Sequence, residues 1–127
     1  MIPSAVLREL KHPVAPEPVR DWSAHPPDWL EVLTPKNIVA IARLDLGETE
    51  AIALATEINA EVLLIDEQAG RQEAARRGLK VAGTLSVLDE ADQAGFVSFD
   101  AAVARLHQTS FRVSQAVLAE IEERRSH

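Results

Sequence analysis

The sequence predicts a small α/β domain in which helices flank a small parallel sheet. Helical and strand-like segments alternate along the 127 residues, and this alternation is typical of βα units with parallel strands. Residues 62–65 form a continuous apolar run, as in a strand that is covered on both faces. Asp66 follows this run, and parallel α/β folds bind ligands at the carboxyl ends of their strands. We therefore expect one domain over residues 1–127 with a site at that edge.

The composition limits the possible functions. The net charge of −7 argues against a domain that binds nucleic acid mainly by neutralising phosphates, because such domains are usually basic. It does not argue against a nuclease, whose carboxylates hold metal ions. The absence of cysteine excludes disulfides and thiolate chemistry. No apolar run approaches the roughly 18 residues that span a membrane, and no secretion signal opens the chain. We expect a cytoplasmic protein without membrane contact.

The first third of the chain is expected to contain one helix and one short strand. Residues 3–11 predict a helix, because Pro3 suits a first helical turn. Residues 12–27 carry five of the seven prolines, which predicts an extended proline-rich loop. Residues 30–33 predict a short strand, and residues 37–44 fit either a strand or a helix.

A further helix is expected to start after Asp45. Asp45 is a favourable N-cap residue, and Glu48 stands three positions later, as in a capping box. Apolar residues at helical spacing between positions 51 and 58 predict a single packed face. Glu48 falls at the rim of that face, in the first turn, and Glu50 projects further from it.

The second half of the chain is expected to hold four more helices and one short strand. Gly78 and Gly95 stand where two of these helices end, as glycine often does. Asp100 and Ser114 are the expected N-cap residues of the last two. The expected helices cover residues 68–77, 85–94, 101–107 and 115 to about 125, and the strand covers residues 80–84.

Two carboxylates are candidate metal ligands and catalytic groups. Glu48 at its helix rim and Asp66 at its strand end converge on one edge of the sheet, and Mg²⁺ and Mn²⁺ prefer carboxylate oxygen and water. We predict that the two carboxylate carbons lie within about 10 Å of each other, because the ions of a two-metal site are roughly 4 Å apart. Structural roles stay open for both: Glu48 in the capping box and Asp66 as the cap of the next helix.

Arg71 is the candidate residue for binding a substrate phosphate. It lies one turn into the helix that follows Asp66, where a guanidinium group can hold a phosphate. Arg76 and Arg77 lie at the C-terminal end of the same helix, where the helix dipole favours cations without any function.

Several blocks of the sequence resemble one protein family. They are Leu-Asp-Leu-Gly-Glu-Thr-Glu-Ala-Ile-Ala-Leu-Ala at residues 44–55, Leu-Ile-Asp-Glu at 64–67, Ala-Gly-Arg at 69–71, Ala-Ala-Arg-Arg-Gly-Leu at 74–79 and Val-Ala-Gly-Thr-Leu-Ser-Val-Leu at 81–88. Residues 2–10 and 111–114 also fit. Together the blocks closely resemble a bacterial branch of the PIN-like domains, uncharacterised relatives of the VapC toxins, over essentially the whole chain.

The resemblance implies a metal-dependent endoribonuclease with acids around one or two Mg²⁺ or Mn²⁺ ions. By position, Glu9 matches the family's second acid, Glu48 the third and Asp66 the fourth. The implied metal ligands are these three residues, and the implied catalytic residues are Glu48 and Asp66. On pattern alone, Glu9 fits a surface carboxylate on an amphipathic helix. The implied partners are an RNA substrate and, for the toxin of a toxin–antitoxin pair, an antitoxin protein.

The chain departs from the family at its N-terminal end. The family's first strand is central in its sheet and ends in the first Asp, whereas residues 2–10 match the segment after the family's second strand. We therefore expect a truncated PIN-like three-layer fold, impaired cleavage, and a homo-oligomer that covers the unpaired edge of residues 62–65. The alternative is a non-catalytic, oligomerising protein-interaction module derived from a PIN domain.

Overall fold

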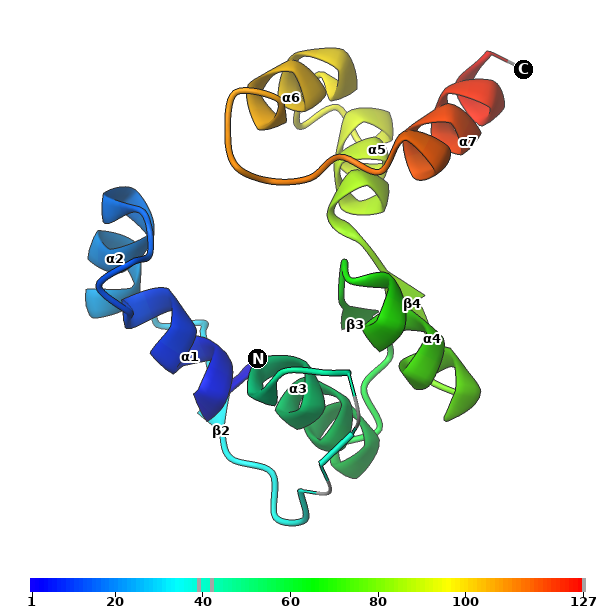
Figure 1. Cartoon of the computed structure of the whole chain (residues 1–127). Helices are drawn as coiled ribbons and strands as arrows, with labels where there is room; N and C mark the ends of the chain where they lie inside the picture. The colour runs from blue at the N-terminus through cyan, green and yellow to red at the C-terminus, as the bar shows by residue number, and fades with distance from the viewer. Residues whose placement is uncertain (39, 42, 127) are drawn as a thin grey trace. The chain divides into compact units, whose positions relative to one another are not determined.

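The computed structural model describes residues 1–126 except residues 39 and 42, and it has a mixed α/β architecture (Figure 1). The predicted fold class is therefore confirmed. The chain groups into two compact units, Met1–Val81 and Ala82–His127, and the expectation of one domain stays a prediction. Among the described residues, no helix combines the length and the apolar character needed to cross a membrane.

The described residues form seven helices and four two-residue strands. In chain order they are β1 (Ile2–Pro3), α1 (Ser4–Lys11), α2 (Glu17–Ala24), β2 (Val32–Leu33), α3 (Leu46–Glu57), β3 (Leu63–Leu64), α4 (Gln68–Arg76), β4 (Val81–Ala82), α5 (Thr84–Gln93), α6 (Phe99–Leu106) and α7 (Gln115–Arg125). The segment 37–44, for which the sequence left strand and helix open, includes residues 39 and 42, which lie outside the described residues.

Two short parallel strands join the start of the chain to the segment after α2. Ile2 pairs with Val32 and Pro3 with Leu33, and the Ile2 N–H donates to the Glu31 carbonyl at 2.8 Å. The strand predicted over residues 30–33 is confirmed with shorter bounds. Helix α1 follows β1 directly, so this pairing fixes where α1 begins.

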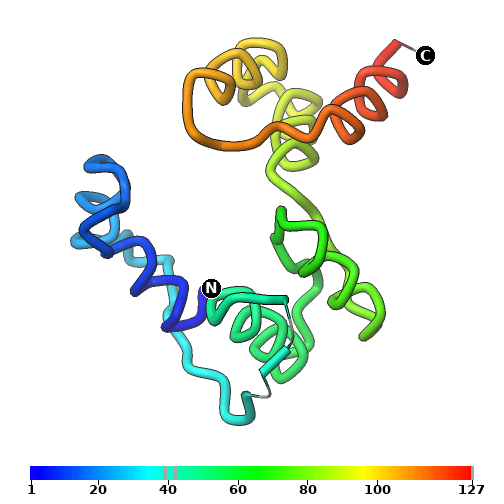
Figure 2. Tube along the Cα trace, viewed as in Figure 1, coloured from blue at the N-terminus to red at the C-terminus, as the bar shows by residue number. Residues whose placement is uncertain are grey.

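The prediction of an extended loop over residues 12–27 is wrong, because α2 forms inside this segment. Pro18 sits in the first helical turn, where its missing N–H would have no partner within the helix. The fully buried Ser23 then docks α2 on α1, since its hydroxyl donates to the Leu10 carbonyl at 3.3 Å. Figures 1 and 2 show α2 folding back beside α1.

Helix α3 is the central element of the first unit. Its predicted N-cap is confirmed, because the Asp45 side chain accepts a hydrogen bond from the Glu48 N–H at 2.8 Å. The prediction of one packed face is wrong: Thr49, Glu50 and Ile52 are buried as well. The reason is that α3 contacts α1, β1, α4 and β3, so neighbours cover it on more than one side.

Strand β3 is short and covered on one side, not on both as predicted. Val62 and Leu64 are exposed, while Ile65 is buried in a core with Ile52 and Ala74. This alternation is the ordinary two-residue period of a strand. Helix α4 follows and ends before Gly78, whose φ of 81° permits the left-handed turn that leads into β4.

The second unit is a helical cluster made by α5, α6 and α7. Its core consists of Leu85, Phe99, Val103, Leu118 and Ile121. The predicted cap Ser114 is confirmed, because its hydroxyl accepts from the Val117 N–H at 3.3 Å. The predicted cap Asp100 is wrong: α6 begins two residues earlier than expected, and Ser98 caps it by accepting from the Ala101 N–H.

Candidate functional site

Helices α1 and α3 run antiparallel and hold each other through carboxylates. Glu50 on α3 is only 3% exposed and accepts hydrogen bonds from the Ala5 N–H at 3.1 Å and the Ser4 hydroxyl at 3.2 Å. Arg8 lies 3.6 Å from its other oxygen. Glu50 thus accepts from a backbone N–H in the first turn of α1, which has no partner within the helix. Sequence reasoning missed this role, since it placed Glu50 away from the packed face.

Glu9 makes the reciprocal contact at the other end of the pair. Its carboxylate accepts a hydrogen bond from the Gly47 N–H in the first turn of α3. A Cβ atom at position 47 would collide with this carboxylate, so glycine permits the close approach. Burial of the carboxylate end and the nearby Asp45 raise the pKa of Glu9, and the Gly47 N–H partly opposes this rise.

Glu48 stands at the centre of a group of four carboxylates. Its pKa is raised, first by burial and then by the negative charges of Asp45, Glu67 and Glu9. One oxygen of Glu48 would lie 3.5 Å from a Cβ atom at Gly70, in the first turn of α4. We call Glu9, Asp45, Glu48 and Glu67 the acidic cluster. It gathers charges from α1 and from the starts of α3 and α4.

The structure brings two of the three predicted metal ligands together. The negative charge of Glu9 contributes to the raised pKa of Glu48. Asp66 is exposed directly after β3 and Ile65, and its neighbour Glu67 contributes to the raised pKa of Glu48. The predicted closeness of Glu48 and Asp66 stays a prediction. So does the phosphate-binding role of Arg71, which is half-buried in the first turn of α4.

The chemistry of the acidic cluster fits a hard divalent cation. Burial first, and then the negative charges of neighbouring carboxylates, raise the pKa values of Glu9 and Glu48, and a bound cation would offset both causes. Within the described part of the chain, no three or more histidine or carboxylate side chains are arranged as a ready cage for an ion. Mg²⁺ does not require such a cage, because it keeps several waters and binds through one or two carboxylates plus substrate phosphates.

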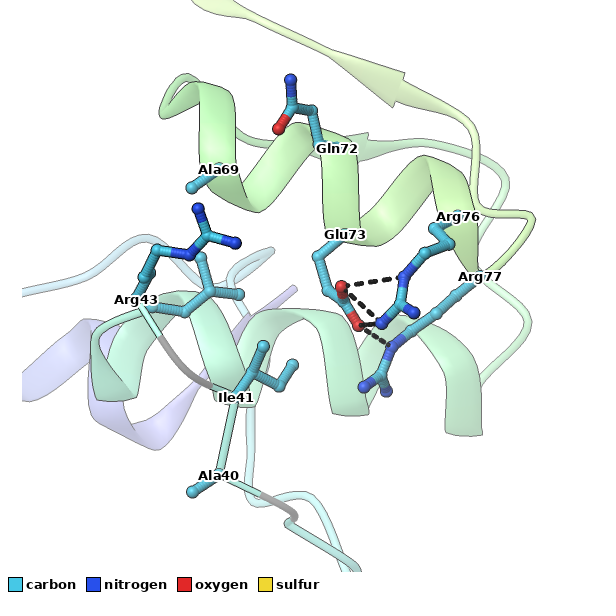
Figure 3. Close-up of a pocket in the computed structure, with 9 residues that line it drawn as sticks. Ala40, Ile41, Arg43, Ala69, Gln72, Glu73, Arg76 and Arg77 are labelled. Atoms are coloured by element: carbon cyan, nitrogen blue, oxygen red, sulfur yellow. Dashed lines mark hydrogen bonds and ion pairs between the residues drawn. The ribbon is translucent and has the colours of Figure 1, made fainter.

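A cavity of about 590 Å³ lies beside α4 in the first unit (Figure 3). Three arginines line it: Arg43 from the segment before α3, and Arg76 and Arg77 from the end of α4. We call it the arginine pocket. Sequence reasoning assigned Arg76 and Arg77 to the helix dipole alone and did not consider Arg43, because no local pattern links a loop residue to a helix end more than thirty positions away.

The chain was compared with protein families, with curated proteins and with solved structures. The family described as the PIN domain matches residues 1–126. No curated protein and no solved structure gives a significant match to the chain. The family match spans both compact units and includes every residue of the acidic cluster and of the arginine pocket.

Proposed function

The chain belongs to the PIN-domain family, and from this premise we propose that it is an endoribonuclease dependent on Mg²⁺ or Mn²⁺. The observation that carries the proposal is that Glu9 and Glu48 both lie beside the first turn of α3. Glu9 belongs to α1 and Glu48 to α3, yet the Glu9 carboxylate accepts from the Gly47 N–H next to Glu48, and the pKa of each carboxyl is raised. Perturbed carboxylates that converge from different elements are a physical signature of a functional site.

Each residue of the site has a distinct proposed role. Glu9 and Glu48 hold the divalent ion, with Asp66 as the third ligand. The ion, when bound, would stabilise the negative charge that develops on the phosphodiester during hydrolysis. The Gly47 N–H orients Glu9, and Asp45 fixes the first turn of α3 and with it the direction of Glu48. Arg71 holds a phosphate of the substrate.

An RNA cleavage assay with matched variants tests the proposal. The purified chain should cleave single-stranded RNA slowly, as expected of an impaired site, with Mg²⁺ or Mn²⁺ and not with EDTA. Glu48→Gln and Asp66→Asn should each lower the rate at least about 100-fold, since loss of a ligand removes charge stabilisation worth several kcal/mol. Glu61→Gln, at an exposed carboxylate after α3, should leave the rate unchanged. Equal cleavage by wild type and Glu48→Gln would refute the proposal and point to a contaminating nuclease.

We further propose that the chain acts as the toxin of a toxin–antitoxin pair. Its membership of the PIN family supports this role. Induced expression in a bacterial host should stop growth, and Glu48→Gln should restore growth at the same protein level. Normal growth with abundant, folded wild-type protein would contradict the toxin role without touching the nuclease proposal.

A second candidate function is a non-catalytic, homo-oligomeric interaction module. An exposed aromatic pair favours it: Trp22 is 44% exposed, Trp29 is 73% exposed, and their ring centroids are 6.5 Å apart. Exposed apolar groups of this size often mark protein contacts. Light scattering at micromolar concentration should then show a dimer that Trp29→Ala converts to a monomer. A wild-type monomer would end this candidate.

A further inference from the structure

We propose that the arginine pocket binds phosphate groups of the RNA strand outside the acidic cluster. The inference rests on the proposed function, because it names where the substrate is held. The pocket is formed by residues 40, 41, 43 and 44 and by one face of α4, and its lining residues are Ala40, Ile41, Arg43, Leu44, Ala69, Gln72, Glu73, Arg76 and Arg77. A volume of about 590 Å³ suits a nucleotide-sized group rather than a single small ion.

Glu73 fixes the two arginines at one end of the pocket. Nη2 of Arg76 lies 2.6 and 2.7 Å from the two Glu73 oxygens, and Arg77 contacts Glu73 through Nε at 2.9 Å. Because Arg77 uses Nε, its two terminal nitrogens point away from Glu73 (Figure 3). A guanidinium held in this way is already oriented, so less side-chain entropy is lost when a phosphate binds.

Arg43 supplies a cation from the opposite side of the pocket. Its φ of 72° lies in the left-handed region that residues with a Cβ atom rarely adopt. In this conformation its side chain extends toward Ala69 on α4 (Figure 3). The lining therefore carries three guanidinium groups and one carboxylate, in a chain whose net charge is −7.

Residues that line the pocket are sequence neighbours of residues in or beside the acidic cluster. Leu44 lines the pocket and precedes Asp45, and Ala69 lines it and precedes Gly70, beside which Glu48 lies. Because neighbouring residues of the chain line the pocket and carry the acids, we place the acids within reach of an RNA strand held in the pocket. The acids repel phosphates when no cation is bound, whereas planar guanidinium groups bind them through paired hydrogen bonds. The pocket thus supplies attraction that the cluster lacks.

Fluorescence anisotropy of a labelled single-stranded RNA in EDTA tests the inference, because cleavage cannot interfere. Arg43→Gln and Arg77→Gln should each weaken binding about fivefold or more. Each should also lower the slope of log affinity against log salt by about 0.7, the value for one lost phosphate contact on a single strand. Arg105→Gln, at an exposed arginine of the second unit, should change neither quantity. Equal binding by wild type and Arg43→Gln would overturn the inference.

Further measurements identify which ligand the pocket binds and check that the variants are folded. Arg43 is exposed and lies outside the helices, so Arg43→Gln should keep the wild-type circular dichroism spectrum and thermal midpoint. Arg77→Lys should recover part of the slope of log affinity against log salt that Arg77→Gln loses. Displacement of the RNA by inorganic phosphate or by polyglutamate as readily as by unlabelled RNA would overturn the assignment to a nucleic-acid strand. Glu48→Gln should lower the cleavage rate at least about 100-fold without abolishing the binding of RNA in EDTA. These two readouts separate failure of this inference from failure of the nuclease proposal.

Discussion

Glu50 shows how a single buried carboxylate can connect two helices. It accepts from Ser4 and from the Ala5 N–H at the start of α1. Glu50→Ala removes this acceptor and leaves a buried N–H without a partner, which should lower the free energy of unfolding by about 2–3 kcal/mol. Glu50→Gln keeps an acceptor oxygen and should cost less. Urea denaturation measures both, with the exposed Glu61→Ala as a control expected to change stability by less than about 0.5 kcal/mol.

Removing the carboxylate of Glu48 should stabilise the fold, whereas removing that of Glu50 should destabilise it. Its pKa in the folded state is raised above the ordinary value of 4.5, so the folded chain binds a proton more readily than the unfolded chain. The contribution of this residue to stability therefore increases as pH falls from neutral through the folded pKa, and it levels off below the unfolded pKa.

Glu48→Gln should accordingly stabilise the metal-free chain at pH 7. We expect a gain of roughly 0.5 kcal/mol, a small value because solvent screens a half-buried group. The gain should shrink toward pH 5. Added Mg²⁺ should raise the thermal midpoint of the wild type and leave that of Glu48→Gln almost unchanged. Urea titrations at the two pH values test the first effect, and a loss of stability in Glu48→Gln at pH 7 would contradict it.

At the residue scale, local patterns predicted some roles and missed others. Asp45 as N-cap could be predicted, because the capping contact with Glu48 spans only three positions. The role of Glu50 could not, because its partners Ser4 and Ala5 lie on another helix. Glu9 showed no functional signal in its own segment, and only the family resemblance pointed to it.

At the scale of elements, Gly47 links a helix start to the candidate site. Alanine inside a helix is ordinarily about 1 kcal/mol more favourable than glycine. Gly47→Ala should nevertheless give little or no gain in stability, because its Cβ atom would displace the Glu9 carboxylate. Mn²⁺ affinity measured by calorimetry should fall to the level of Glu9→Gln. Unchanged affinity in Gly47→Ala would show that Glu9 is not a ligand.

The element predictions failed where tertiary packing decides the outcome. The ends of α4 and α5 could be predicted, because Gly78 and Gly95 adopt the positive φ that glycine allows. Helix α2 was missed because prolines discourage a helix only beyond its first turn, and Pro18 falls within that turn. The burial of β3 was overestimated because an apolar run does not reveal how many of its faces will find a partner.

At the scale of the whole molecule, the two units have separate apolar cores. Phe99 is 1% exposed in the core of the second unit, and Phe99→Ala should cost about 3–5 kcal/mol there. Hydrogen exchange should then show lost protection in α5, α6 and α7, while α1 and α3 keep theirs. Equal loss of protection in both units would instead support one cooperative domain over the whole chain. The sequence predicted the α/β class, but no composition change marks the boundary at residue 81.

The reciprocal carboxylate contacts between α1 and α3 also bear on how the chain folds. The first turn of each helix lacks one hydrogen-bond acceptor until the other helix packs beside it. Glu50 accepts from the first turn of α1, and Glu9 accepts from the first turn of α3. The two helices can pack together only when the segment between them, which holds α2 and β2, brings its ends together. The entropic cost of this closure must be met before the carboxylate contacts contribute. If this closure is the rate-limiting event, Glu50→Gln should slow refolding in stopped-flow experiments more than it speeds unfolding, with a φ-value above about 0.5. The same pair of acids would then set both the geometry of the site and the time the chain needs to form it.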